Sequence, residues 1–319
     1  MTLILAAGNS DQFIQISDRR LTREDGSIGD DESNKSILLR CANARLAIGF
    51  TGLAGCEVFN TREWLLSTLN ECALPDRTAH NLFNRFAIRA TERFRRLHLA
   101  RDRKRLTIMA TGYLDGIDPP LGALAVISNC QNLDTGVLSS EAWDDFRCFF
   151  REEQRPNSGS IALFFDVGTL PSVRPVDSAK VIELVKARKP ADAIVGKLLE
   201  IFRRCAESPL GGNLIGKQLM SLIIPRERSR AVLCGYHSDT VKQETYFPDQ
   251  ILVESDKLHM NVINVSVRPG DPANTPPMSG PRLRPGQTCW CTSGKKFKRC
   301  HGRISKNRLP ISFEAKPGV

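Results

Sequence analysis

The sequence lacks the features that would place it in a membrane or send it along a secretory route. No apolar run approaches the ~18 residues that a membrane-spanning helix needs. The apolar run near the N-terminus, Leu3–Ala7, is too short for the core of a signal peptide, and no basic residue precedes it. We therefore expect a cytoplasmic (cytosolic) protein without a membrane span.

A glycine-rich phosphate loop is also missing, so the sequence gives no direct indication of ATP binding. With 319 residues, 41% of them hydrophobic, the chain can form one large domain or one domain with a small module. In a reducing compartment most of its ten cysteines are expected to be thiols or metal ligands rather than disulfides.

Acidic residues are absent from residues 282–308, although this stretch is strongly basic. Its nine cationic residues are Arg282, Arg284, Lys295, Lys296, Lys298, Arg299, Arg303, Lys306 and Arg308. Because the whole chain has a formal net charge of +10, the remainder is close to neutral. A short basic tail can contact nucleic acid, an acidic protein or a membrane surface, and it does not indicate a DNA-binding fold.

Apolar periodicity predicts strands, two helices, strands, two helices and strands, in that order. The expected helices are Glu57–Cys72, Thr78–Arg101, Ser178–Arg188 and Ala191–Ala206. The expected strands are Thr2–Ala7, Phe13–Leu21, Lys35–Cys41, Arg45–Phe50, Leu106–Leu114, Ala123–Asn129, Ser160–Val167, Gln218–Ile224, Ala231–Tyr236, Thr245–Val253 and Met260–Val267. Residues 131–158 are polar and irregular, as an insertion would be.

This order differs from the strand–helix alternation of a parallel doubly wound sheet. It indicates an α+β fold with antiparallel sheets and a helix pair on each side, a four-layer αββα sandwich. We expect this body to span residues 1–267. Residues 268–284 are rich in proline and glycine and predict a linker. A small knuckle is expected at 285–303, followed by a disordered tail at 304–319.

The knuckle is predicted from four residues with the chemistry of a zinc site. Cys289 and Cys291 form one pair, and eight residues separate them from the pair Cys300 and His301. Zinc prefers four such ligands in a tetrahedron, and a turn at Ser293-Gly294 would let the two pairs meet. Because about twenty residues cannot build a core, the metal would supply most of the folding energy. Four protein ligands predict a structural Zn²⁺ rather than a catalytic one; the alternative is a basic tail with incidental cysteines.

The same segment resembles the SEC-C motif, best known at the C-terminus of the SecA translocase motor. The resemblance includes Gly294-Lys295-Lys296-Phe297 before the Cys-His pair. It departs from the family pattern at Trp290 and Thr292, where Pro and Gly are common and neither residue is a ligand. The resemblance implies an interaction module that docks to a protein or ribosome partner.

A second constellation lies near the N-terminus. Removal of Met1 would expose Thr2, whose hydroxyl can act as a nucleophile and whose own α-amine, titrating near pH ~8, can accept the proton. Asp18 closes the second expected strand, Lys35 opens the third, and a turn ending at Gly52 closes the fourth. Taken singly, each of these residues also has an ordinary explanation. Thr2 is a common second residue, Asp18 and Lys35 are typical solvated charges at strand ends, and Gly52 is a turn residue.

Together they resemble the proteasome β-subunit and HslV peptidase family of N-terminal nucleophile (Ntn) hydrolases. The spacings are 16 residues from Thr2 to Asp18 and 17 from Asp18 to Lys35. The resemblance covers roughly residues 2–265 and implies that Thr2 is nucleophile and base. It further implies that Lys35 lowers the pKa of the Thr2 centre, that Asp18 orients Lys35, and that the Gly52 region supplies the oxyanion donor. Family members form rings, which implies a homo-oligomer.

The resemblance is incomplete in the second half of the chain. The family completes its site with a Ser in mid-chain and with an Asp and a Ser after the last helix pair. The matching stretch here, 208–217, has the glycines but no Asp-x-x-Ser. Ser160 and Ser208 are candidate substitutes.

Three functions remain open on the sequence. The first is a threonine-type peptidase or amidohydrolase that cleaves a protein or peptide substrate, with the zinc knuckle as a docking module. The second is a non-catalytic proteasome-like scaffold or adaptor that binds partners through the SEC-C tail. The third is a ribosome- or nucleic-acid-associated factor acting through the basic tail. A free Thr2 amine distinguishes the first from the second.

Overall fold

In the computed structural model, the chain divides into two units, Met1–Pro269 and Gly270–Val319. The described residues all lie in the first unit: 3–22, 28–30, 33–41, 43–56, 58–73, 79–116, 118–132, 137–152, 162–168, 173–209, 214–238 and 249–252. The expected linker, zinc knuckle, tail and the strand Met260–Val267 lie outside them, and the domain boundaries stay predictions.

The first sheet has five strands in the order β12-β1-β2-β13-β14. Neighbouring strands are antiparallel. Their bounds are β1 Leu3–Gly8, β2 Gln12–Asp18, β12 Leu163–Gly168, β13 Leu219–Pro225 and β14 Leu233–His237. The turn between β1 and β2 is closed by Asn9, whose Oδ1 accepts hydrogen bonds from the backbone N–H of Asp11 at 2.8 Å and of Gln12 at 3.0 Å.

The second sheet has six strands in the order β11-β10-β9-β6-β5-β15. The bounds are β5 Ser36–Cys41, β6 Ala44–Gly52, β9 Leu106–Leu114, β10 Leu121–Ser128, β11 Arg147–Glu152 and β15 Asp249–Leu252. β15 runs parallel to β5, and the other neighbours are antiparallel. Two short hairpins lie outside the sheets: β3 Leu21–Thr22 with β4 Ile28–Asp30, and β7 Gly55–Cys56 with β8 Phe59–Asn60.

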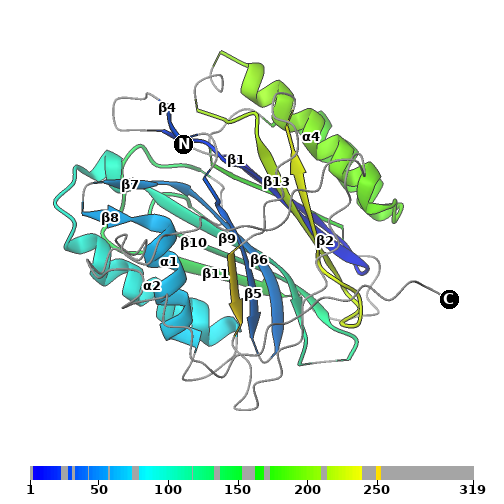
Figure 1. The fold of residues 1–319 in the computed structure, drawn as a ribbon, viewed down its shortest axis with the longest axis horizontal. Coiled ribbons are helices and arrows are strands. Elements are labelled where there is room, and N and C mark those ends of the chain that lie inside the picture. The colour runs from blue at the N-terminus through cyan, green and yellow to red at the C-terminus, as the bar shows by residue number, and fades with distance from the viewer. Residues whose placement is uncertain are drawn as a thin grey trace, which may run out of the picture. The chain divides into compact units, whose positions relative to one another are not determined.

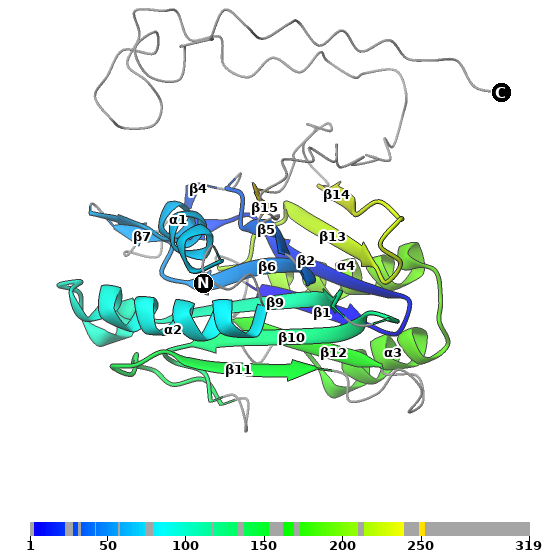
Figure 2. The ribbon, with the colours of Figure 1, turned by 90° about the horizontal axis from the view of Figure 1, so that it is seen from below.

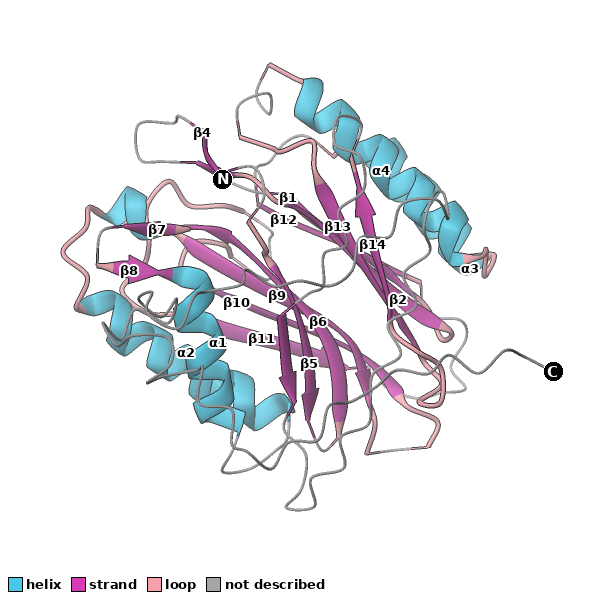
Figure 3. Cartoon of the chain, in the orientation of Figure 1, coloured by secondary structure: helices cyan, strands magenta, loops and turns pink. Residues whose placement is uncertain are grey.

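Each sheet is covered on one face by a helix pair (Figures 1 and 3). The helices are α1 Thr61–Ala73, α2 Ala79–Arg95, α3 Pro175–Lys186 and α4 Ala191–Glu207, and a short 3₁₀ helix spans Arg101–Lys104. On α2, Phe83 and Phe86 belong to a stripe at helical spacing that packs on the second sheet. On α4, Leu198 and Phe202 belong to the stripe that packs on the first sheet.

The opposite faces of the two sheets pack against each other, because successive strand residues point to alternate sides. Ile4 of β1 lies in one cluster with Met109 of β9. Leu222 of β13 lies in another with Tyr113 of β9. The Tyr113 hydroxyl also donates a hydrogen bond of 2.8 Å to the Asn9 carbonyl, so a polar contact crosses between the sheets. Figure 2 shows the two sheets and their helices from below.

The two helices α3 and α4 are joined by a buried carboxylate. Asp177, in the first turn of α3, has a side chain 2% exposed and lies 2.6 Å from Arg204 and 3.6 Å from Lys197 of α4. Arg174 approaches the same carboxylate to 2.9 Å. The hydrogen bond from Arg174, with further help from Arg204, lowers the pKa of Asp177 to about 2.

The predicted mixed fold with antiparallel sheets is confirmed. The prediction that residues 131–158 are irregular is wrong in part, because β11 lies within this stretch. β11 is an edge strand whose residues are half-buried or exposed, so its sequence shows no clean alternation. The first helix begins at Thr61 rather than Glu57, since Phe59-Asn60 pairs with β7. The second ends at Arg95 rather than Arg101.

A buried arginine joins the two sheets at the start of β6. The guanidinium of Arg45 forms two hydrogen bonds to Asp115, of 2.8 and 3.0 Å, and both side chains are at most 6% exposed. The same group donates to the carbonyls of Pro225, at 2.9 Å, and Arg226, at 2.7 Å, where β13 ends. Arginine suits this position because its planar guanidinium has enough N–H donors to bind the carboxylate and the carbonyls at the same time.

We predict that Arg45→Met lowers the free energy of unfolding by about 3 kcal/mol, because the buried Asp115 carboxylate keeps only the half-exposed Arg228 as its cation and the carbonyls of Pro225 and Arg226 lose this donor. Urea unfolding of the full chain measures the loss. Arg89→Met, which removes a 63% exposed arginine paired with Glu92, is the matched control and is expected to change stability by less than about 1 kcal/mol. A similar small loss for both variants would contradict the prediction.

Candidate functional site

The structure brings together two residues that the sequence singled out, Asp18 and Lys35. Asp18 ends β2 of the first sheet, and Lys35 precedes β5 of the second. Lys35 Nζ lies 3.7 Å from Asp18 Oδ2, and the two side chains are 1% and 0% exposed. Lys35 Nζ also donates to the Arg20 carbonyl. A fully buried ion pair thus spans the two sheets at one end.

Backbone N–H groups from three segments hold the Asp18 carboxylate. Oδ1 accepts a bond of 3.3 Å from Leu3, the first residue of β1. Oδ2 accepts bonds from Arg20 at 3.3 Å and from Gly216 at 2.9 Å. The contact with Leu3 ties Asp18 to the residue that follows Thr2 in the chain. Three such donors favour the charged form of a carboxylate.

Gly216 is a residue of this site to which the sequence analysis gave no role. A Cβ atom at this position would lie 2.8 Å from Arg20 Cβ and 3.1 Å from Arg20 N, so a larger residue would push the segments apart. The glycines of residues 208–217, which include Gly216, were noted in the sequence analysis. Its role depends on a contact between residues 198 positions apart, which the pattern does not encode.

Burial dominates the ionisation of the pair. It raises the pKa of Asp18, against the attraction of Lys35 and the N–H of Gly216. It lowers the pKa of Lys35, against the attraction of Asp18. A lysine with a lowered pKa exchanges its proton more readily than an exposed one, and perturbed groups of this kind gather at functional sites.

A polar network adjoins the pair on both strands. Ser17 Oγ and Ser36 Oγ, each next in sequence to a member of the pair, are 2.9 Å apart and buried. Arg19 donates to the Ser33 carbonyl at 3.3 Å and to the Gln218 side chain at 3.4 Å. These contacts fix the ends of β2 and β5 relative to each other and limit the freedom of the ion pair.

Gly52 ends β6 with a φ of 110°, a conformation that favours glycine. A Cβ atom there would lie 2.2 Å from the Arg105 carbonyl oxygen, to which Leu53 N donates at 2.7 Å. The backbone geometry therefore requires glycine at this turn. The assignment of the Gly52 region as oxyanion donor stays a prediction.

The other candidate residues are placed as follows. Thr2, Ser160 and the four expected zinc ligands (Cys289, Cys291, Cys300 and His301) lie outside the described residues. Ser208 Oγ donates to the Cys205 carbonyl at 2.7 Å, which makes it a cap of α4. Within the described part of the chain, no group of three or more His, Cys, Asp or Glu residues could hold a metal ion. Among the same residues, no helix is long and apolar enough to cross a membrane.

Comparison with known proteins gives one family-model match, to the SEC-C motif at residues 287–303, which confirms the motif predicted from the sequence. No curated protein matches the chain.

Similar solved structures include Anbu (ancestral beta-subunit) from Yersinia bercovieri, 15% identical with a TM-score of 0.45, and an Anbu (Gly-1) mutant from Hyphomicrobium sp. strain MC1, 13% identical with a TM-score of 0.43. Each covers 70% of this chain and 81% of its own. Eukaryotic HslV from Trypanosoma brucei is 14% identical with a TM-score of 0.33, covering 70% of this chain and 99% of its own. At these identities and TM-scores, the similarity does not assign the chain to a subfamily or indicate its activity.

We predict that the ionised Asp18–Lys35 pair lowers the free energy of unfolding of the protein, and that the effects of mutating its two members are strongly coupled. Both pKa shifts favour the neutral forms, so at pH 7, between the ordinary values of 3.8 and 10.5, the ionised pair lowers the free energy of unfolding. Lys35→Met alone would leave a buried carboxylate and is expected to cost about 3 kcal/mol. The double variant with Asp18→Asn should recover most of that loss. Urea unfolding of the four proteins gives the coupling.

The penalty of Lys35→Met should also depend on pH. It should shrink as the pH falls through the raised pKa of Asp18, because protonation removes the unpaired charge. Additive losses in the double variant, together with a penalty independent of pH, would contradict a coupled buried pair.

Proposed function

We propose that this chain is an N-terminal-threonine hydrolase that cleaves peptide or other amide bonds. The observation that carries the proposal is the buried Asp18–Lys35 pair, whose carboxylate is hydrogen-bonded to the backbone of Leu3. A cation held next to the start of the chain is what an N-terminal nucleophile requires. The two face-to-face sheets with outer helix pairs support assignment to the αββα sandwich of Ntn hydrolases.

In the proposed mechanism the Thr2 hydroxyl attacks the substrate carbonyl, and the free α-amine of Thr2 takes the hydroxyl proton. The amide C–N bond then breaks, the α-ammonium group returns this proton to the leaving amine, and water hydrolyses the ester left on Thr2. Lys35 favours deprotonation of the Thr2 centre through its positive charge. Asp18 holds Lys35 in position, and Gly216 with Arg20 hold Asp18. A backbone N–H of the Gly52 region stabilises the oxyanion that develops on the carbonyl.

The C-terminal module is proposed to bind one structural Zn²⁺ through Cys289, Cys291, Cys300 and His301. Three thiolates and one imidazole are a donor set that suits tetrahedral zinc, and the SEC-C match covers all four residues. The ion would hold the short segment folded. We propose that the folded module docks the enzyme to a protein or ribosome partner, and that the body assembles into a homo-oligomer in the cytoplasm.

Intact mass spectrometry with a peptide epoxyketone, which traps N-terminal threonine, tests the hydrolase. Protein produced with its native N-terminus is expected to begin at Thr2 and to gain one adduct. Thr2→Ala should gain none, and Lys35→Met should react at least about tenfold more slowly, because the nucleophile loses its cation. Lys180→Met, at an exposed lysine of α3 paired with Glu183, is the matched control and should react normally.

A chain that retains Met1 and gains no adduct would overturn the hydrolase proposal. It would favour the non-catalytic scaffold, because a blocked amine cannot serve as the base.

The zinc module is tested separately by metal analysis of the purified full chain. One zinc ion per chain is expected, and Cys300→Ser should lose it because three ligands remain. Cys148→Ser, at a half-buried thiol of β11, is the control and should retain the metal. Zinc retained by Cys300→Ser would rule out the proposed ligand set. Normal adduct formation by that variant would show that the reaction of Thr2 does not require the zinc ion.

A further inference from the structure

Arg19 directly follows Asp18, and its side chain is fully buried. It is 1% exposed, although arginine is rarely buried unless its charge and its N–H groups are satisfied. Its Nε donates to the carbonyl of Ser33 at 3.3 Å, and Ser33 lies two residues before Lys35. The side chain thus connects the segment that carries Lys35 to the residue after Asp18, from one sheet to the other.

Gln218 holds the other side of the guanidinium. Its Oε1 accepts a hydrogen bond from Arg19 Nη1 at 3.4 Å and another from the Tyr236 hydroxyl at 2.9 Å. Its backbone carbonyl accepts a bond of 3.0 Å from the Arg19 N–H. The guanidinium carbon also lies 5.4 Å from the centre of the Tyr236 ring, within the range of a cation–π contact. The guanidinium is therefore held by the segment that leads into β13 and by β14.

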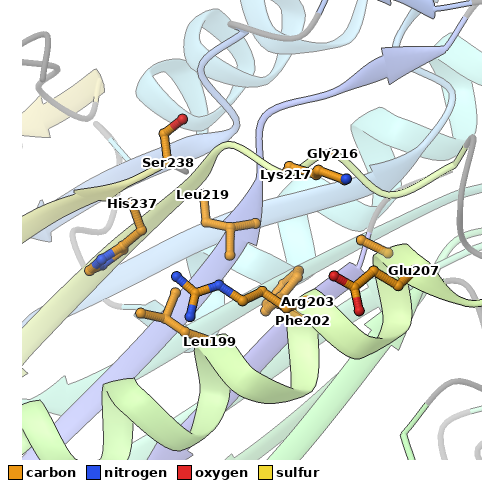
Figure 4. A pocket seen from close by; sticks show the side chains of 10 residues that line it. Leu199, Phe202, Arg203, Glu207, Gly216, Lys217, Leu219, His237 and Ser238 are labelled. Carbon is orange, nitrogen blue, oxygen red and sulfur yellow. The ribbon is translucent and has the colours of Figure 1, made fainter. Parts of the chain in front are cut away.

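The segment that leads into β13 supports both Asp18 and Arg19. The N–H of Gly216 donates to the Asp18 carboxylate at 2.9 Å, and Gln218 comes two residues later. Figure 4 shows this segment at Gly216 and Lys217, beside the end of β14. One short stretch of backbone thus holds both the carboxylate of the ion pair and the arginine that follows it.

We propose that Arg19 is a positioning residue, which sets the distance between Lys35 and Asp18 by holding segment 33–35 in place. The inference deepens the proposed function and rests on it, because the position of Lys35 matters for catalysis only if its charge acts on Thr2. Lys35 Nζ and Asp18 Oδ2 are 3.7 Å apart. Since the energy between charges varies with their distance, a small displacement of either segment changes both the pair and its effect on the nucleophile.

A direct effect of the Arg19 charge on Lys35 is the alternative explanation of any change in an Arg19 variant. Tyr236→Phe distinguishes the two, because it removes the hydroxyl that binds Gln218 and leaves every charge in place. The variant also leaves unchanged the charged groups that act on Lys35, which are Asp18, Arg20 and Asp30.

The first measurement is the pKa of the Lys35 ammonium in the full chain, by NMR with isotope-labelled lysine and assignment against Lys35→Met. Burial is the main cause that lowers this pKa. Arg19→Met and Tyr236→Phe are expected to raise it toward the ordinary value of 10.5, because a loosened segment admits water to the ammonium. Arg19→Lys, which keeps the charge without the planar fork, should raise it too. This readout requires no hydrolysis.

The second measurement is the pH dependence of adduct formation with the peptide epoxyketone. The rate should rise with pH as the Thr2 amine loses its proton, and the charge of Lys35 holds the pKa of that amine down. In Arg19→Met and Tyr236→Phe the rise is expected to move to higher pH by about half a unit, so that the reaction below the amine pKa is about threefold slower. A variant that lost only stability would not move this rise.

Arg45→Met and Tyr113→Phe are the matched controls, since they remove a buried arginine and a buried hydroxyl at the opposite end of the sheets. Both should leave the pKa of Lys35 and the pH profile unchanged. The positioning role is overturned if Tyr236→Phe leaves the pKa of Lys35 unchanged, if Arg19→Lys restores it, or if the controls shift it as much. A parent chain that forms no adduct, with the expected shifts in the pKa of Lys35, would overturn the hydrolase proposal alone.

Discussion

The buried ion pair between Asp18 and Lys35 is the constraint on which this end of the molecule depends. Each residue belongs to a different sheet, and neither charge reaches solvent. Because burial disfavours both charges, the pair persists only if the surrounding backbone holds it, and N–H groups from Leu3, Arg20 and Gly216 do so. The start of β1 and the segment before β13 must therefore converge on Asp18.

The opposite end of the sheets is joined in a different way. Arg45 binds Asp115 within its own sheet and reaches the carbonyls at the end of β13. Between the two ends, apolar side chains of both sheets interlock, and the helix pairs cover the outer faces. The sheets are thus joined by charge at both ends and by apolar packing in the middle, which leaves little freedom for one to slide on the other.

This arrangement explains why a site at the Asp18 end can be precise. Asp18 is the last residue of β2 and Lys35 directly precedes β5, so the pair is attached to strands of both sheets, and the serine contact between β2 and β5 limits further movement. A rigid support lets a charged group act on a neighbour without reorganising, which is what electrostatic catalysis requires.

The sequence by itself determined the order of most strands and helices, because apolar periodicity follows from local geometry. It also identified Asp18 and Lys35, through their spacing and family resemblance, and the SEC-C motif, through its cysteine pattern. The tertiary structure alone decided that Gly216 supports Asp18, that β11 forms an edge, and that Arg45 joins the sheets. The roles of Gly216 and Arg45 depend on contacts between segments some 180 or more residues apart, which a local sequence pattern does not encode. The edge strand β11 buries little of its surface, so its sequence lacks the alternation that would reveal a strand.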